Sequence, residues 1–145
     1  MVSGDSVTPE KEEYTPTEGS AVSLRCTYET SSEYIYLYWY RHNSNQAPQF
    51  LLYKGARSWS SEEHIPDKRY KSTTSSTSTE LVITSLTLAD TALYYCALRD
   101  YTHVFLLCSS RLHLTIVPSS RVNMHPFYCV KRRSLVLYIT CNERN

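Results

Sequence analysis

The residues of this 145-residue chain that could carry chemistry are its five cysteines and five histidines, and their spacing decides which chemistry is available. The histidines, at positions 42, 64, 103, 113 and 125, do not cluster, and no Cys-x-x-Cys pair occurs. The sequence therefore lacks the grouped ligands of a metal site. Its three glycines, at 4, 19 and 55, form neither a phosphate-binding loop nor a Gly-x-Ser-x-Gly elbow. We expect no metal, cofactor or catalytic site, although a catalytic Cys/His pair stays open on the sequence alone.

Two cysteines fit a structural disulfide. In the stretch Asp90–Cys96, strand periodicity places Ala92, Tyr94 and Cys96 on one face. Cys26 ends a second alternating stretch and Trp39, a ring able to pack on the bridge, lies between the two cysteines. This order is typical of strands B, C and F of an immunoglobulin-type β-sandwich, with Tyr94 as a tyrosine corner. The alternative is an unrelated β-sandwich with a chance Cys and Trp.

The elements that must position these residues are strands. From Asp5 to Arg99 we count about nine strand segments separated by turns, and extra segments between strands C and D favour the variable type of sandwich. Pro9 and Pro16 predict a broken edge strand A. Arg69 and Asp90 are candidates for an exposed salt bridge that closes the base. The predicted core residues are Leu24, Leu37, Trp39, Leu81, Ile83 and Tyr94.

Composition limits the class of protein. A net charge of +1 gives no reason to expect a nucleic-acid partner. A paired Cys26 and Cys96 favour an oxidising compartment, with a reduced cytosolic protein as the alternative. The first residues contain no apolar segment of a secretory signal, and no apolar stretch is long enough to span a membrane. We therefore expect an extracellular domain whose leader and membrane anchor are absent from this chain.

Four motifs resemble the variable domain of a T-cell receptor alpha or delta chain. They are Cys26-Thr27-Tyr28-Glu29-Thr30, Leu37-Tyr38-Trp39-Tyr40-Arg41, Pro48-Gln49-Phe50-Leu51-Leu52 and Asp90 to Leu98. The resemblance covers Gly4 to Asp100, so we expect a V-type domain at residues 4–100. It implies a receptor domain that binds antigen, usually a peptide held by a major histocompatibility molecule. Signalling subunits would be reached only through constant and membrane regions.

The resemblance also assigns two surfaces. A second variable domain, beta- or gamma-like, would pair with a sheet face carrying Tyr38, Tyr40, His42, Pro48 and Tyr95. His42 stands where the family usually has glutamine, which puts the usual inter-domain hydrogen bond in question. The antigen loops would include Ser31, Ser32, Glu33, Tyr34, Lys54, Arg57, Trp59, Leu98, Arg99 and Asp100.

Residues 101–145 depart from the family. The Phe-Gly-x-Gly motif of a joining segment is absent, so we expect strand G to be missing or atypical and the edge of strand F to be open. The stretch Leu112–Pro118 alternates like a strand and is similar to the end of a joining segment. Our hypothesis is translation past the germline end of an unrearranged variable segment, giving an irregular tail that adds at most one strand. A recombination signal in the genomic DNA soon after the Asp100 codon would support it, and an intact spliced exon there would refute it.

Two functions remain in view. The first is an antigen-receptor variable domain on the outer side of the plasma membrane. The second is a standalone V-type receptor or adhesion module with fixed loops. A joining and constant exon spliced after residue 100 would favour the first, and a transcript that encodes its own membrane span would favour the second.

Overall fold

The computed structural model describes residues 4–100, 108–118, 128–132 and 138–142. These residues form β-strands and one short 3₁₀ helix, η1. The elements are β1 (Ser6–Pro9), β2 (Glu13–Tyr14), β3 (Val22–Glu29), β4 (Tyr34–His42), β5 (Gln49–Arg57), β6 (Glu63–His64), β7 (Tyr70–Thr74), β8 (Ser78–Ile83), η1 (Leu88–Asp90), β9 (Ala92–Asp100), β10 (Cys108–Leu114), β11 (Tyr128–Arg132) and β12 (Tyr138–Asn142).

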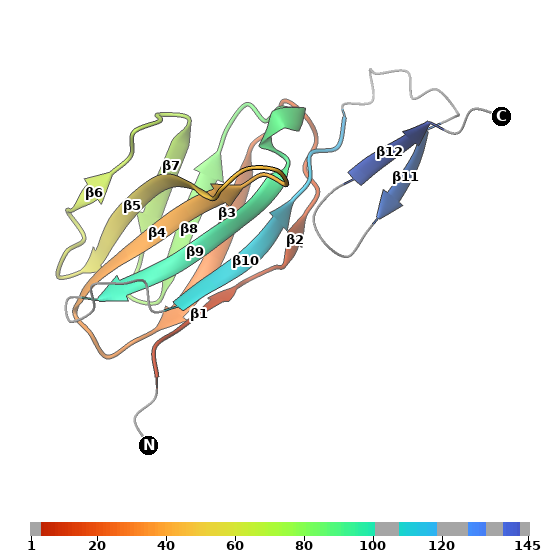
Figure 1. The fold of residues 1–145 in the computed structure, drawn as a ribbon. Coiled ribbons are helices and arrows are strands. Elements are labelled where there is room, and N and C mark those ends of the chain that lie inside the picture. Colours follow the sequence, from red (N-terminus) through yellow and green to blue (C-terminus); the bar gives the residue numbers. More distant parts are fainter. Residues whose placement is uncertain (1–3, 101–107, 119–127, 133–137, 143–145) are drawn as a thin grey trace.

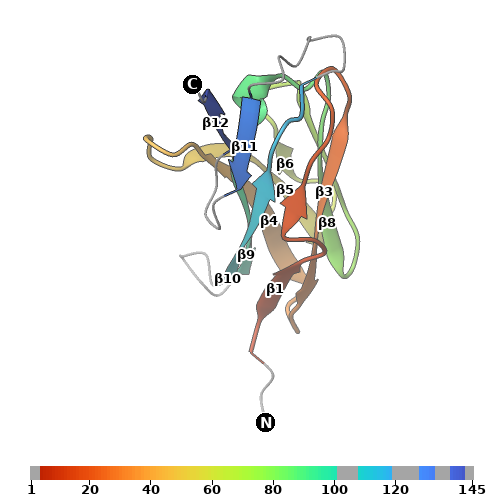
Figure 2. The same cartoon turned by 90° about the vertical axis from the view of Figure 1, so that its right-hand side faces the viewer.

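Two sheets face each other as the layers of a sandwich (Figures 1 and 2). One has four strands in the order β1-β3-β8-β7, and the other has six in the order β2-β10-β9-β4-β5-β6. Neighbouring strands are antiparallel except β2 and β10, which run parallel. Strands β11 and β12 form a separate two-stranded sheet. The predicted mainly-β sandwich is confirmed, and β5 and β6 supply the extra strands of the variable type.

The core forms because alternate residues of facing strands point inward. In β3 the side chains of Leu24 and Cys26 are fully buried while their neighbours are exposed, and in β4 Leu37 and Trp39 are fully buried while their neighbours are only partly exposed. The remaining predicted core residues, Leu81, Ile83 and Tyr94, also have no exposed surface. At about 25 cal/mol per Å² of buried apolar area, these side chains supply the main favourable term of folding.

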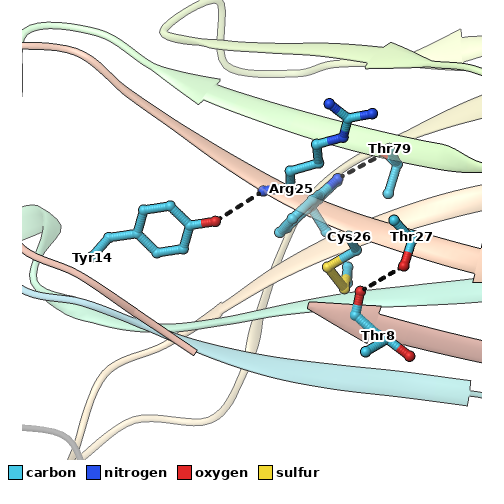
Figure 3. Close-up of a disulfide and its surroundings, with 8 residues drawn as sticks. Thr8, Tyr14, Arg25, Cys26, Thr27 and Thr79 are labelled. Atoms are coloured by element: carbon cyan, nitrogen blue, oxygen red, sulfur yellow. Dashed lines mark hydrogen bonds between the residues drawn. A yellow bond between two sulfur atoms is a disulfide. The ribbon is translucent and has the colours of Figure 1, made fainter. Parts of the chain in front are cut away.

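A disulfide joins the two sheets. The Cys26 and Cys96 sulfurs are bonded, with the Cα atoms 6.7 Å apart, and Figure 3 shows the bridge beneath β3. Trp39 pairs in register with Cys96, and its indole N–H donates to Thr79 Oγ1 on the opposite sheet at 3.2 Å. The buried indole therefore has a polar partner as well as apolar contacts, which such a ring needs inside a core.

The first strand changes sheet, in agreement with the predicted broken edge. β1 pairs with β3, and after Pro9 the chain crosses to the other sheet, where β2 pairs with β10. In Figure 3, Thr27 of β3 donates to the Thr8 carbonyl, and the Tyr14 hydroxyl accepts from the Arg25 amide across the sandwich. Both contacts are long, at 3.5 Å, so backbone pairing carries most of the connection.

The expected open edge on β9 is wrong, because β10 covers it. The two strands pair from Cys108 opposite Leu98 to Leu114 opposite Ala92. Leu112, Leu114 and Ile116 alternate into the core with at most 4 % of their surface exposed. The alternation in Leu112–Pro118 thus marks a real strand G position, built without the usual glycines. It is the one strand that the described part of the tail adds to the sandwich, so β10 is atypical in sequence but regular in pairing.

The base of the sandwich holds a buried carboxylate. The predicted Arg69–Asp90 pair forms, with the closest contact at 2.6 Å, but the Asp90 side chain is only 1 % exposed, so the pair is not a surface one. Burial opposes ionisation of Asp90, but hydrogen bonds from Arg69 and from the Thr87 amide outweigh it and lower the pKa of Asp90 below its usual value. The Tyr94 hydroxyl donates to the Asp90 carbonyl at 3.0 Å, which is the geometry of a tyrosine corner.

Candidate recognition surfaces

The outer face of the six-stranded sheet carries contacting aromatic rings. Tyr38 and Tyr40 stack with ring centroids 6.2 Å apart, and Tyr38 also meets Phe50 and Tyr53 at 6.2 and 5.4 Å. Tyr36 meets Tyr53 at 5.1 Å. We call Tyr36, Tyr38, Tyr40, Phe50 and Tyr53 the aromatic face. Phe50 is still 37 % exposed and the tyrosines of β4 are partly exposed, so the rings remain available to a partner.

A bulge in β5 assembles part of this face. Tyr53 pairs with Tyr38 and Leu52 with Trp39, but Phe50 pairs with Tyr40, so Leu51 is an extra residue in the strand. Without it, residues 50 and 53 would point to opposite sides of the sheet. Strict alternation along β5 would place only one of Phe50 and Tyr53 on this face, so sequence reasoning did not assign the two residues to it. It also missed Tyr36, which the same alternation that found Tyr38 could have identified.

The face continues toward the base through His42 and Tyr95. Their rings lie 6.3 Å apart on adjacent strands, and Pro48 is exposed in the turn before β5. The Nδ1 atom of His42 is buried and has no hydrogen-bond partner among the described residues. A buried polar atom without a hydrogen-bond partner is unfavourable, so a hydrogen bond supplied by another molecule would be stabilising. All five residues predicted for the partner-domain face therefore lie on, or at the edge of, one surface.

The side chains that form the aromatic face are themselves uncharged. Burial raises the pKa of Tyr36 and of Tyr40, so both phenols stay neutral at physiological pH. A cation, Arg99, lies against the aromatic face, and its guanidinium donates to the Tyr38 hydroxyl at 3.3 Å. Neutral aromatic surfaces with hydroxyl tips are enriched in protein–protein interfaces because they combine apolar area with hydrogen bonding.

The loop before β4 and the loop after β5 lie at one end of the sandwich, where β9 also ends, on the left in Figure 1. Ser31 and Glu33 are exposed and Ser32 is half-buried, and Tyr34 is 50 % exposed at the first position of β4. Trp59 contacts Tyr34 at 5.4 Å and stacks on Tyr36 at 4.6 Å. Gly55 permits the close approach of the Trp59 backbone, since a Cβ at position 55 would lie 2.0 Å from the Trp59 carbonyl oxygen.

Four residues assigned to the antigen surface point elsewhere. Leu98 is fully buried in β9 opposite Leu37, so its assignment to that surface is wrong. Asp100 is 8 % exposed at the end of the same strand, and Lys54 binds Glu63 of β6 at 2.6 Å. The Arg57 guanidinium points inward to the backbone carbonyls of neighbouring loops. Leu98, Arg99 and Asp100 were predicted to lie in an antigen loop, but β9 runs to Asp100, and residues 101–107 lie outside the described residues.

The described residues show neither a metal-binding cluster nor a membrane-spanning helix. The described residues contain no group of three or more His, Cys, Asp or Glu side chains arranged to hold a metal ion. A search of the same residues for a helix long and apolar enough to cross a bilayer found none. Within the described part of the chain, the candidate recognition surfaces are the aromatic face and the end of the sandwich that carries residues 30–34 and 57–62, which we call the loop end.

Fold and site together define a class. Two sheets in this strand order, joined by one disulfide over a buried tryptophan, form an immunoglobulin domain of the variable type.

The comparisons with known proteins agree with this class. The model of the immunoglobulin V-set domain family matches residues 9–117. The mouse T-cell receptor alpha chain V region CTL-F3 is 42 % identical over 99 residues, which are 67 % of this chain and 71 % of that protein. Human T cell receptor alpha variable 18 is 40 % identical over 100 residues, covering 67 % and 84 % of the two chains.

A solved structure shares the fold. A chain from a study of T-cell specificity and activation by the bacterial superantigen toxic shock syndrome toxin-1 superposes with a TM-score of 0.67 over 79 % of this chain and 100 % of its own, at 16 % identity. The present chain belongs to the immunoglobulin V-set family and is of the T-cell receptor alpha variable type. Such domains are receptor modules and not enzymes.

Proposed function

We propose that this chain binds antigen through its loop end and pairs with a second variable domain through its aromatic face. The observation that carries the proposal is the partly exposed aromatic face, on the outside of a sheet whose inner side is already buried. Its relatives are T-cell receptor alpha variable regions, which supports the same role here. The domain would act outside the plasma membrane in adaptive immunity, as one part of a larger receptor.

Pairing follows from the chemistry of the face. Tyr38 and Tyr40 offer apolar ring area, and their hydroxyls offer hydrogen bonds at the rim. His42 brings a buried and unpartnered ring nitrogen to the same surface. A matching domain would present a neutral aromatic face and a donor or acceptor opposite His42, as a beta- or gamma-type variable domain would. Because His42 replaces the family's usual glutamine, it would narrow the choice of partner domain.

The loop end suits ligand binding for a different reason. Tyr34 and Trp59 are rings with few rotatable bonds, set among serines and Glu33, and this mixture gives contact area at a low entropic cost. The proposed ligand is a peptide held by a major histocompatibility molecule or a similar composite surface.

The test is pairing in solution. The refolded full chain, mixed with a T-cell receptor beta variable domain, is expected to elute as a heterodimer in size-exclusion chromatography with light scattering. Tyr38→Asp, which places a charge at the centre of the face, is expected to abolish that peak. Ser23→Asp on the outer side of the four-stranded sheet is the matched control and should pair normally. Persistence of the heterodimer in the Tyr38 variant would refute the assigned face.

A further inference from the structure

Arg57 holds three loops at the proposed ligand-binding end. Its Nη1 donates to the carbonyls of Thr30 and Ser32, at 2.9 and 2.6 Å, in the loop before β4. Its Nε and Nη2 donate to the carbonyl of Ser76, at 3.1 and 2.9 Å, in the turn between β7 and β8. Arg57 itself begins the loop between β5 and β6. A single planar guanidinium therefore spans three separate segments, as its fixed fork of donors allows.

Further contacts fix the position of this guanidinium. The side chain is only 15 % exposed, and its Cζ lies 5.5 Å from the centre of the Tyr28 ring, within cation–π range. The Tyr28 hydroxyl donates in turn to the Ser75 carbonyl at 2.5 Å. Glu33 stands 4.0 Å from Nη1 and is largely exposed, so it contributes little.

The backbone at Arg57 is held in an unfavourable conformation. Its φ is +55°, in the left-handed region that residues with a Cβ seldom adopt. Such a conformation persists when surrounding interactions determine it, and here the side chain supplies four hydrogen bonds. The turn that results sends Ser58 N–H to the Glu33 carbonyl at 3.1 Å, a direct link between two of the loops.

We propose that Arg57 is a positioning residue that couples the loops at 30–33, 58–62 and 75–77 into one preorganised recognition surface. Its guanidinium faces inward to backbone carbonyls and does not meet the ligand. The surface would thus include the turn between β7 and β8 together with the first two loops, and it would lose little conformational entropy on binding. The part played in recognition rests on the proposed function, whereas the coupling itself does not.

Residue-resolved hydrogen exchange of the ¹⁵N-labelled full chain tests the coupling. The amides of Ser32, Ser58 and Thr77 each report on one loop through bonds to Thr30, Glu33 and Ser75. Arg57→Gly removes the guanidinium while accepting the positive φ, and we expect all three amides to exchange at least about tenfold faster, with the amides of β4 and β9 unchanged.

Two further variants make the result specific. Arg57→Lys keeps the charge, but one ammonium group cannot reach both Ser32 and Ser76, so at least one loop should stay unprotected. Arg69→Lys, at the opposite end of the sandwich, should leave the three amides unchanged. Exchange at the wild-type rate in both Arg57 variants, or acceleration of Ser58 alone, would overturn the coupling. If the Gly variant does not fold, the Lys variant decides alone.

The outcome is distinguishable from a failure of the proposed function. Pairing with a beta variable domain uses the aromatic face, so Arg57→Lys should form the heterodimer as well as the wild type. Absence of any heterodimer with the wild-type chain would count against the proposed pairing and leave the exchange result standing.

Discussion

Removing the Arg69 guanidinium should destabilise the domain strongly at neutral pH and hardly at all in acid. In Arg69→Met, a side chain of similar length replaces a group that donates to Asp90 at 2.6 and 2.9 Å. The carboxylate, 1 % exposed, would keep the Thr87 amide and an Arg41 nitrogen 3.8 Å away. It would lose its closest charge partner while remaining buried.

The stability lost in Arg69→Met should lie between two limits. Breaking a fully buried pair costs about 3–5 kcal/mol, and an exposed pair contributes about 0–1 kcal/mol. Arg69 is 36 % exposed and its charge is screened in part, so we expect a loss of about 2 kcal/mol in the free energy of unfolding. For a domain of this size, that corresponds to a fall of roughly 8–15 °C in Tm.

The pH dependence supplies the sharper test. Because the pKa of Asp90 is lowered in the folded state, its contribution is complete above the pKa of the unfolded chain, 3.8, and is lost as pH falls through the folded value. The unfolding free energies of wild type and Arg69→Met, measured with urea, should therefore differ by a constant amount from pH 5 to 8, and the difference should shrink as the pH falls below 3.8. Lys71→Met, an exposed cation on β7, is the control and should change stability by less than about 0.5 kcal/mol. A difference below 0.5 kcal/mol at pH 7, or one unchanged in acid, would refute the reasoning.

Three further changes test other parts of the fold by the same urea assay. Cys96→Ala removes a disulfide between residues 70 apart in sequence, and the loop-entropy relation gives a loss of about 4 kcal/mol in the free energy of unfolding. In a reducing buffer, which opens the same disulfide in the wild type, the variant and the wild type should be equally stable. Tyr94→Phe removes one hydrogen bond, to the Asp90 carbonyl, and should cost about 1 kcal/mol. Leu112→Ala should cost about 2–5 kcal/mol if β10 packs on the core as described, whereas a neutral result would mean that residues 108–118 do not belong to the folded domain.

Much of the fold could be predicted because its determinants are local. The alternation around Leu24, Leu37 and Trp39 has the period of a strand with one face in the core, and that period is visible in any window of the sequence. The Cys26–Cys96 pairing followed from the order of three residue types. Each of these inferences needs only the spacing along the chain and the rule that apolar side chains leave water.

The parts that could not be predicted depend on contacts between distant segments. The Leu51 bulge is defined by its partner strand, so the shared orientation of Phe50 and Tyr53 has no signature in β5 alone. The burial of Asp90 arises from segments that meet only in the folded chain. Arg57 was assigned to the ligand surface because the family resemblance places its loop there, and its inward orientation depends on carbonyls of two other loops.

Strand β10 shows what closing this sheet physically requires. Among the described residues, left-handed φ values at non-glycine positions occur at Arg57 and Ser85, and neither lies in β10. A regular extended strand has no need of glycine, so alternation of Leu112 and Leu114 into the core is enough to fix its register on β9. Strand β2, however, pairs with β10 only through His113 and Leu114. β10 therefore covers β9 from Ala92 to Leu98, and β2 covers only the end of β10 among the described residues, so a strand without glycine is enough to complete the sandwich.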